Sequence, residues 1–348
     1  MGNMDNFEQS PLLIDCFGFQ WHITNRCDQK CIHCYGEDFS SEKDPEIQTL
    51  IDISDLIFKS LAPGSVTVNV TGGEPLLYSD IFPFLNHLSS FSNLQELNLI
   101  TNALDLSDLT IESLVGAGLS SVKVSFESHL PKVNDSIRGS GHFEKVQQNI
   151  MRLKQAGLPV ILMVTLGDWN FDSVSGLIDF AARRNIDAVI FERYVPLGRG
   201  NKLAGGVLSA TQWTAVINAI IEETGVGNSV QELLPFRAFR VDTLNWEDGG
   251  KERLSGAFCN LGPESMALMP DGTVFPCRRL PIAIGTLPTQ NIKEIISALG
   301  QFSPQKIARK MEKSRCGSCV IENCAGCRAL SLALSRSLYA DDPQCAGK

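Results

Sequence analysis

The sequence predicts an α/β protein in which a barrel or partial barrel of parallel strands precedes a small, loop-rich C-terminal domain. Two observations predict this division. Short apolar runs alternate with amphipathic stretches from residue 17 to about residue 195, which is the pattern of βαβ units with right-handed crossovers. After Cys259, glycine, proline and cysteine interrupt the sequence too often for long elements to form.

Six strands are predicted in the first part of the chain, each short, apolar and followed by a turn. They are 17–24, 66–70, 96–100, 121–126, 160–166 and 188–194. The helices predicted between them lie near 48–60, 80–91, 107–117, 142–156 and 171–184. Helices should therefore cover the outside of the strands, and the chemistry should gather at the carboxyl ends of the strands.

The later elements are fewer and shorter. A helix is predicted near 209–224, a polar connector at 245–256, and a hairpin in LMPDGTVFPC with Asp271-Gly272 in its turn. The expected segments are an N-terminal piece, a barrel, a bridging helix with a linker, and a C-terminal domain. Their ranges are 1–16, 17–205, 206–255 and 256–348.

Composition excludes several classes of protein. The net charge of −9 over 348 residues gives no support to nucleic-acid binding. No apolar run approaches the roughly 20 residues that span a bilayer. The acidic N-terminus lacks the basic and then apolar pattern of a secretory signal. We therefore expect a cytoplasmic protein with neither a nucleic-acid nor a membrane partner.

The eleven cysteines fall into two separate regions. Four lie in the first 34 residues, none lies between 35 and 258, and seven lie between 259 and 345. A cytoplasmic location and this uneven distribution both argue against a disulfide framework. The pattern indicates two regions in which cysteines bind metal.

The first region contains Cys27, Cys31 and Cys34 in NRCDQKCIHCY, directly after the first predicted strand. Three such thiolates can hold three irons of a 4Fe–4S cluster and leave the fourth iron open to a second molecule. Two alternatives remain from the residues alone. One is zinc with His22 or His33 as the fourth ligand, and the other is a set of close-packed structural cysteines.

Polar residues also follow the later strands. TGGEP, residues 71–75, follows the second strand, where glycines let a backbone approach a ligand and a carboxylate can accept a bond from an ammonium group. An ordinary strand-to-helix turn is the alternative. Thr101-Asn102, Ser125, Glu127, Ser128 and Arg193 follow the third, fourth and sixth strands, so they should face one end of the barrel.

NRCDQKCIHCY, followed about 40 residues later by TGGEP, resembles the radical S-adenosylmethionine (SAM) superfamily over residues 17 to about 200. The resemblance implies a partial (β/α)6 TIM-like barrel and a 4Fe–4S cluster on Cys27, Cys31 and Cys34. It also implies that SAM chelates the open iron through its amino and carboxylate groups. Reductive cleavage of SAM would then give a 5′-deoxyadenosyl radical that takes a hydrogen atom from substrate.

The same resemblance implies which residues bind SAM. Gly72, Gly73 and Glu74 would line its amino group, and Ser125 and Glu127 would lie near its ribose or carboxylate. Arg138 in NDSIRGSGHF would pair with its carboxylate, and a solvated loop arginine is the alternative. The full set of implied cofactor-binding residues is Gly72, Gly73, Glu74, Pro75, Asn102, Ser125, Glu127, Arg138 and His33. No catalytic acid or base is identified.

The seven later cysteines resemble the SPASM extension of radical SAM enzymes, which holds auxiliary iron–sulfur clusters. The resemblance assigns Cys259, Cys277 and Cys327 to a first auxiliary cluster, and Cys316, Cys319, Cys324 and Cys345 to a second. A zinc ribbon with spare cysteines is the alternative. The first set lacks a fourth cysteine, so its last iron would be open, held by another residue type, or held by Cys16. An open iron there could bind a substrate thiolate.

Relatives of this kind frequently modify peptides or proteins, so the expected function is peptide maturation by hydrogen-atom abstraction. The chain starts almost directly at the first strand, so recognition should use the barrel mouth, the SPASM domain or a separate protein. An electron donor such as ferredoxin or flavodoxin is expected. The ending GCRA…DPQC also resembles enzymes of haem and haem d1 synthesis, which makes tetrapyrrole modification the first alternative. A non-catalytic iron–sulfur electron-transfer or scaffold protein is the second.

Overall fold

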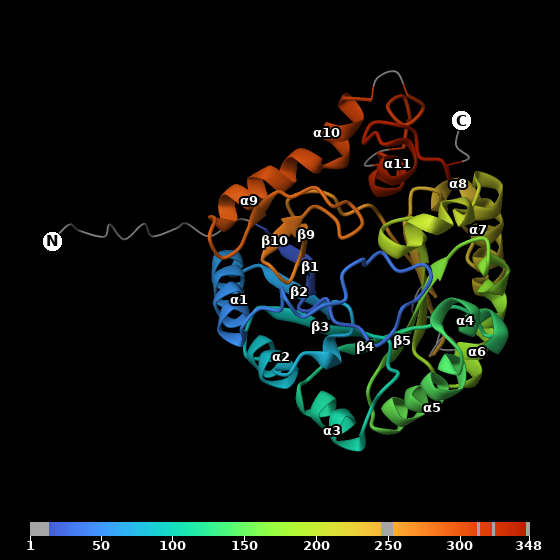
Figure 1. The fold of residues 1–348 in the computed structure, drawn as a ribbon. Coiled ribbons are helices and arrows are strands. Elements are labelled where there is room, and N and C mark those ends of the chain that lie inside the picture. The colour runs from blue at the N-terminus through green and yellow to red at the C-terminus, as the bar shows by residue number, and fades with distance from the viewer. Residues whose placement is uncertain (1–13, 245–252, 312–313, 322–323, 346–348) are drawn as a thin grey trace.

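The computed structural model describes residues 14–244, 253–311, 314–321 and 324–345 of the chain. Within these ranges eleven strands form one sheet, in the order β11-β10-β9-β1-β2-β3-β4-β5-β6-β7-β8. The strands are β1 (Cys16–His22), β2 (Ser65–Thr71), β3 (Leu94–Thr101), β4 (Ser121–Ser125), β5 (Val160–Leu166), β6 (Ala188–Arg193), β7 (Ala238–Asp242), β8 (Leu254–Ala257), β9 (Ser265–Leu268), β10 (Thr273–Phe275) and β11 (Gly285–Thr286). Figure 1 shows this sheet curving around the centre of the molecule.

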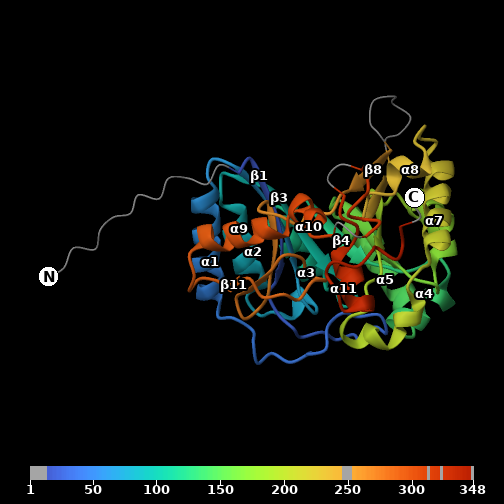
Figure 2. The same ribbon diagram turned by 90° about the horizontal axis from the view of Figure 1, so that it is seen from above.

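Strands β1 to β6 are parallel neighbours in chain order, so the prediction of six βαβ-linked strands is confirmed. Helices pack outside them, and Figure 2 shows α1 and α7 on opposite sides of the strands. The α-helices are α1 (Ile47–Leu61), α2 (Ile81–Ser89), α3 (Asp108–Gly116), α4 (Pro131–Arg138), α5 (His142–Gln155), α6 (Val174–Arg183), α7 (Ala210–Thr224), α8 (Val230–Leu233), α9 (Ile292–Leu299), α10 (Pro304–Arg309) and α11 (Arg328–Ser335).

The parallel strands alternate between apolar and polar side chains. In β2, Val66, Val68 and Val70 are fully buried in the hydrophobic core beneath the helices. The residues between them face the centre of the barrel, where Asn69 Oδ1 accepts a hydrogen bond of 2.7 Å from Lys123 Nζ on β4. Because side chains alternate along a strand, the same parity turns Ser125 of β4 and Thr165 of β5 toward the barrel centre.

Several elements were not predicted from the sequence. β7 and β8 extend the sheet antiparallel beyond β6, and β9 pairs parallel with β1 at the other side. The predicted hairpin around Asp271-Gly272 is confirmed as β9 and β10. The sheet therefore crosses the predicted boundary at residue 255. Of the predicted connector, residues 245–252 lie outside the described ranges and residues 254–257 form β8.

No single helix in the described ranges is long and apolar enough to cross a membrane. The 3-10 segment η3 (Gly198–Gly206) and α7 meet the length and composition requirement together, but they are bent by 92° at their junction. The apolar side chains of α7, including Trp213 and Ile217, are buried in the core of the barrel.

Candidate functional site

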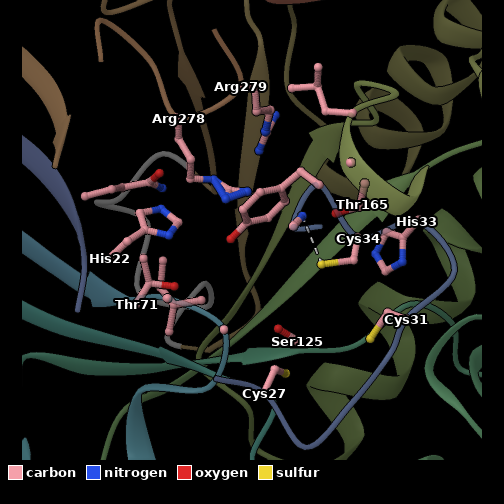
Figure 3. A pocket seen from close by; sticks show the side chains of 18 of the residues that line it. His22, Cys27, Cys31, His33, Cys34, Thr71, Ser125, Thr165, Arg278 and Arg279 are labelled. Carbon is pink, nitrogen blue, oxygen red and sulfur yellow. Dashed lines mark hydrogen bonds between the residues drawn. The ribbon is translucent and has the colours of Figure 1, made fainter. Parts of the chain in front are cut away.

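A cavity of about 510 Å³ lies at the carboxyl ends of the parallel strands. Its walls are the loop after β1, the ends of β2 to β6, and the segment that follows β10 (Figure 3). Glu37 and Asp38 on its edge are exposed, so the cavity reaches solvent. The predicted site residues on its wall are Cys27, Cys31, His33, Cys34, Gly72, Gly73, Asn102, Ser125 and Arg138.

The three thiols of the loop after β1 share this cavity, as Figure 3 shows. Cys34 Sγ accepts a hydrogen bond of 3.3 Å from the Gly36 backbone N. Cys31 is buried, with Arg138 Nη1 at 3.6 Å from its sulfur. Burial raises the pKa of Cys27 to about 12 and also raises the pKa of Cys31, where Arg138 opposes the rise.

This arrangement suits an iron–sulfur cluster better than one metal ion. Among the described residues, no three His, Cys, Asp or Glu side chains converge on a single ion site. Structural zinc needs such convergence, whereas a cluster spreads its ligand sulfurs over several irons. The Nε2 of His33 lies 3.1 Å from Glu127 Oε1, so this ring nitrogen is paired with a carboxylate and does not point at the thiols. The raised pKa values of Cys27 and Cys31 disfavour their thiolates in the absence of a bound cation.

The two glycines of TGGEP hold the cysteine loop against β2. The Gly73 backbone N donates to Thr24 O at 2.8 Å, and the Glu74 N donates to Arg26 O at 2.7 Å. Gly72 has φ +153°, and a Cβ on either glycine would lie within 3.0 Å of the carbonyl oxygen of Thr24 or Arg26. Glycine is therefore required for this close approach of two backbones.

The Glu74 carboxylate points into the protein and does not line the cavity. Its oxygens accept hydrogen bonds from Thr101 Oγ1 at 2.7 Å, Asn102 N at 2.7 Å and Leu76 N at 3.1 Å. Burial raises its pKa to about 7, and these hydrogen bonds oppose the rise. Glu74 thus ties the end of β2 to the end of β3, and the buried Pro75 begins the 3-10 turn η1 (Pro75–Leu77) that follows it.

Asn102 reaches the cavity and also the cysteine loop. Its Nδ2 donates a hydrogen bond of 2.6 Å to Asp28 Oδ1, next to Cys27. The structure therefore links TGGEP, the end of β3 and the cysteine loop in one continuous network. Ser125 ends β4 and lies on the wall beside Thr165 of β5.

Glu127 and Arg138 form an ion pair behind the cavity wall. Arg138 Nη2 donates to Glu127 Oε1, and Thr165 N donates to Glu127 Oε2 at 2.9 Å. Glu127 is fully buried and does not line the cavity, so the structure does not bring it to the space predicted for SAM. Arg138 is the last residue of α4, only 10% of its side chain is exposed, and its guanidinium lies on the wall. The alternative of a solvated loop arginine is wrong.

Two arginines on the wall were missed from the sequence. Arg278 lies over the ring of Tyr35, and its buried Nη1 has no hydrogen-bond partner in the part of the chain that the structure describes. Arg279 pairs with Glu192 and donates a hydrogen bond of 3.1 Å to Arg193 O. Two adjacent arginines after Cys277 in an acidic chain were a sequence signal for an anion-binding site. Their position on the cavity wall follows from the pairing of β9 with β1, which the sequence does not reveal.

The seven C-terminal cysteines separate into two groups in space. Cys259, Cys277 and Cys327 pack against one small hydrophobic cluster that includes Leu261 and Leu280. Burial raises the pKa of Cys259 to about 12, and the neighbouring Cys327 and Cys277 thiols add to the rise. The other four share the wall of a cavity of about 20 Å³. They are Cys316, Cys319, Cys324 and Cys345.

Cys16 lies apart from both groups. It is exposed at the start of β1, and its sulfur is 3.5 Å from Gln95 Oε1. The cavity lies beyond the other end of β1, about 20 Å away at the usual rise of a strand. Cys16 is therefore not placed to complete a cluster with Cys259, Cys277 and Cys327.

Comparison with protein families defines the class of this chain. Residues 21–181 match the radical SAM superfamily, and residues 259–328 match SPASM, an iron-sulfur cluster-binding domain. The chain contains a radical SAM domain followed by a SPASM domain, and it is a radical SAM enzyme. Its cofactors are iron–sulfur clusters and SAM. The non-catalytic alternative is thereby set aside.

Individual relatives give a divided picture of the substrate. An AdoMet-dependent heme synthase from Methanosarcina barkeri is 25% identical, covering 93% of this chain and 95% of that protein. A GTP 3′,8-cyclase from Alkaliphilus oremlandii is 26% identical, covering 82% and 89%. Among solved structures, native anSMEcpe with bound AdoMet has a TM-score of 0.69 at 17% identity, covering 94% of each chain. Streptococcus suis SuiB bound to precursor peptide SuiA has a TM-score of 0.67 at 16% identity, covering 95% and 76%.

Proposed function

We propose that this enzyme cleaves SAM reductively and modifies a peptide or protein by taking a hydrogen atom from one of its residues. When bound, the cluster and SAM supply a 5′-deoxyadenosyl radical. Cys27, Cys31 and Cys34 would hold the radical cluster, and the two C-terminal cysteine groups would each hold an auxiliary cluster. An external donor such as ferredoxin or flavodoxin would deliver the electron.

The size of the cavity and its open edge carry the peptide proposal. Its volume of about 510 Å³ is that of a site for one drug-sized ligand. SAM must occupy much of that space, so the remainder admits a side chain more readily than a macrocycle. Exposed Glu37 and Asp38 leave the edge open, which allows a longer chain to continue outside while one residue enters. The likeness in fold to a peptide-bound structure agrees with this proposal.

The chain's own residues would orient SAM and substrate. Gly72, Gly73 and Asn102 offer backbone and amide groups beside the thiols, and Arg138 offers a cation next to Cys31. Glu74 and Glu127 act through neighbouring residues, because their oxygens are bound inside the protein. Ser125 and Thr165 provide hydroxyl groups on the wall of the same cavity.

The test is hydrogen transfer under anaerobic conditions. Reduced, cluster-loaded enzyme is mixed with SAM and with a deuterated candidate peptide, such as one encoded beside the gene. Deuterium in the 5′-deoxyadenosine and a mass change in the peptide are the expected results. Absence of 5′-deoxyadenosine under strongly reducing conditions would contradict the radical assignment, whereas formation without deuterium would reject only that peptide.

Modification of a tetrapyrrole is the second candidate, and two observations favour it. The resemblance to the haem synthase runs over nearly the whole chain. Arg278 also places a guanidinium without a carboxylate partner among the described residues on the cavity wall, where it could bind a propionate. Titration with Fe-coproporphyrin III decides this point. Tight binding that shifts the Soret band, followed by SAM-dependent loss of carboxylate, would replace the peptide proposal.

A further inference from the structure

A buried set of ionised groups lies between the two C-terminal cysteine groups. Asp342 is fully buried, and its Oδ2 accepts hydrogen bonds from Arg193 Nη1 at 2.9 Å and Arg237 Nη1 at 3.1 Å. The same oxygen accepts a hydrogen bond of 2.8 Å from the Cys327 backbone N. Asp342 therefore joins the barrel strand β6, the residue before β7, and one cysteine of the three-cysteine group.

Arg237 also reaches the other cysteine group. Its Nη2 lies 3.0 Å from Cys324 Sγ, while its Nη1 binds Asp342. Only 13% of its side chain is exposed. A planar guanidinium held at one edge by a carboxylate is fixed in orientation, so its other edge points steadily at the sulfur.

Among the described residues, the arginines near these cysteines outnumber the carboxylates that pair with them. Arg193 and Arg237 share the single carboxylate of Asp342. Arg328 is 1% exposed, donates to the carbonyls of Leu338 and Ala340, and among the described residues has no carboxylate within ion-pair distance. Its Nη2 lies 3.9 Å from Cys316 Sγ. Buried surplus cations are costly unless an anion is near, and a thiolate-bound iron–sulfur cluster supplies one.

We propose that Arg237 raises the reduction potential of the cluster held by Cys316, Cys319, Cys324 and Cys345, through its hydrogen bond to Cys324 Sγ, and that Asp342 positions it. A hydrogen bond to a cluster sulfur stabilises the more negative, reduced state. Arg237, the residue before β7, therefore acts more strongly on this cluster than on the other auxiliary cluster. This inference rests on the proposed cluster ligands and not on the peptide substrate.

The experiment uses the full chain with Cys27, Cys31 and Cys34 replaced by alanine, so that only C-terminal clusters contribute. Iron and sulfide are counted, and midpoint potentials are read by electron paramagnetic resonance at controlled potential. Arg237→Gln removes the positive charge and keeps most of the side-chain volume. Arg237→Lys keeps the charge but lacks the planar guanidinium that can bind Asp342 and Cys324 at the same time. Arg240→Gln is the matched control, because Arg240 lies on β7 three residues away and pairs with Asp242 at the surface.

Arg237→Gln should keep its iron and move one midpoint to a more negative value while leaving the other in place. Arg237→Lys should give a smaller shift in the same direction, and Arg240→Gln should give none. An unshifted midpoint with full iron content overturns the inference, as does an equal shift of both clusters. If Arg237→Gln loses iron, the Arg237→Lys variant decides the question. A wild-type midpoint potential in Arg237→Lys, or loss of iron from it, then also overturns the inference. If the parent shows no second cluster, the ligand assignment under the proposed function fails instead.

Discussion

The two cysteine regions differ in what surrounds their sulfurs. The loop after β1 places three thiols on a cavity of about 510 Å³ that reaches solvent. Four C-terminal thiols share a cavity of about 20 Å³ and lie among buried arginines. The proposed radical cluster would therefore have room for a further molecule beside it, whereas the small cavity leaves almost none beside the proposed auxiliary cluster. The difference in volume fits chemistry at the first site and a cofactor without added substrate at the second.

The two regions are also held in different ways. Backbone hydrogen bonds from TGGEP fix the cysteine loop, with glycines at the closest contacts. The C-terminal groups are fixed by ionised side chains that converge on Asp342. At the cysteine loop one arginine, Arg138, lies next to a sulfur, whereas Arg237 and Arg328 both approach sulfurs of the four-cysteine group. The predictions below test this contrast, from the largest expected effect to the smallest.

Replacing Cys27, Cys31 and Cys34 by alanine should abolish SAM cleavage while both C-terminal groups keep their iron. The reason is that only these sulfurs face the cavity that can admit SAM. Chromatographic assay of 5′-deoxyadenosine and iron analysis check it. Continued formation of 5′-deoxyadenosine by the triple variant would sink the central assignment.

Replacing Cys316 and Cys319 by alanine should remove one cluster, about four irons, from the enzyme. Their sulfurs line the small enclosed cavity and not the large one, so SAM cleavage should continue while modified product is lost. Iron analysis and mass spectrometry of the product measure the two effects. Unchanged iron content would show that these cysteines do not bind a cluster.

Gly73→Ala should destabilise the protein by about 1–3 kcal/mol and strongly reduce SAM cleavage, because the new Cβ would collide with the carbonyl of Arg26 and move the cysteine loop. Gly116→Ala is the control. Gly116 lies in α3 with nothing within 4 Å of a Cβ, so alanine there should be neutral or stabilising by about 0.5–1 kcal/mol. Equal effects of the two variants would contradict the role of Gly73.

The smallest effect concerns the Glu74 carboxyl. Its folded pKa of about 7 lies above the ordinary value of 4.5, chiefly because of burial. The folded protein therefore binds the Glu74 proton more tightly than the unfolded chain does. The stability that this gives is complete below about pH 4.5 and is lost as pH rises through 7. The free energy of unfolding should fall by about 1 kcal/mol between pH 6 and pH 8 through this group. Denaturant unfolding at both pH values measures this decrease in the free energy of unfolding, and Glu74→Gln should make the decrease smaller. If the decrease is the same in Glu74→Gln, Glu74 is not its source.

Much of the barrel was predictable because its signals are local. Strand periodicity gave β1 to β6, and the cysteine spacing picked out the loop that lines the cavity. The inward direction of Glu74 was not predictable, since it depends on where Thr101 and Asn102 lie after β3 forms. The contact of Arg237 with Cys324 joins residues 87 positions apart, and no local pattern marks it.

The predicted ligand sets of the C-terminal cysteines came from a family resemblance, and the two spatial groups have the same members. Spacing alone could not divide Cys324 from Cys327, which lie three residues apart. The structure separates them because Cys324 turns toward Arg237, whereas the Cys327 backbone N binds Asp342. The fourth ligand of the cluster proposed on Cys259, Cys277 and Cys327 stays a prediction.

The pairing of β9 with β1 affects how the enzyme is made. Of the described strands β1 leaves the ribosome before the others, but its neighbour on one side, β9, is about 250 residues later in the chain. Until β9 emerges, that edge of β1 has unpaired backbone groups and can pair wrongly with other chains. Synthesis of the last third of the chain therefore completes the sheet that supports the radical site. A fragment that ends before β9 should aggregate, so the SPASM domain cannot be exchanged like an independent module.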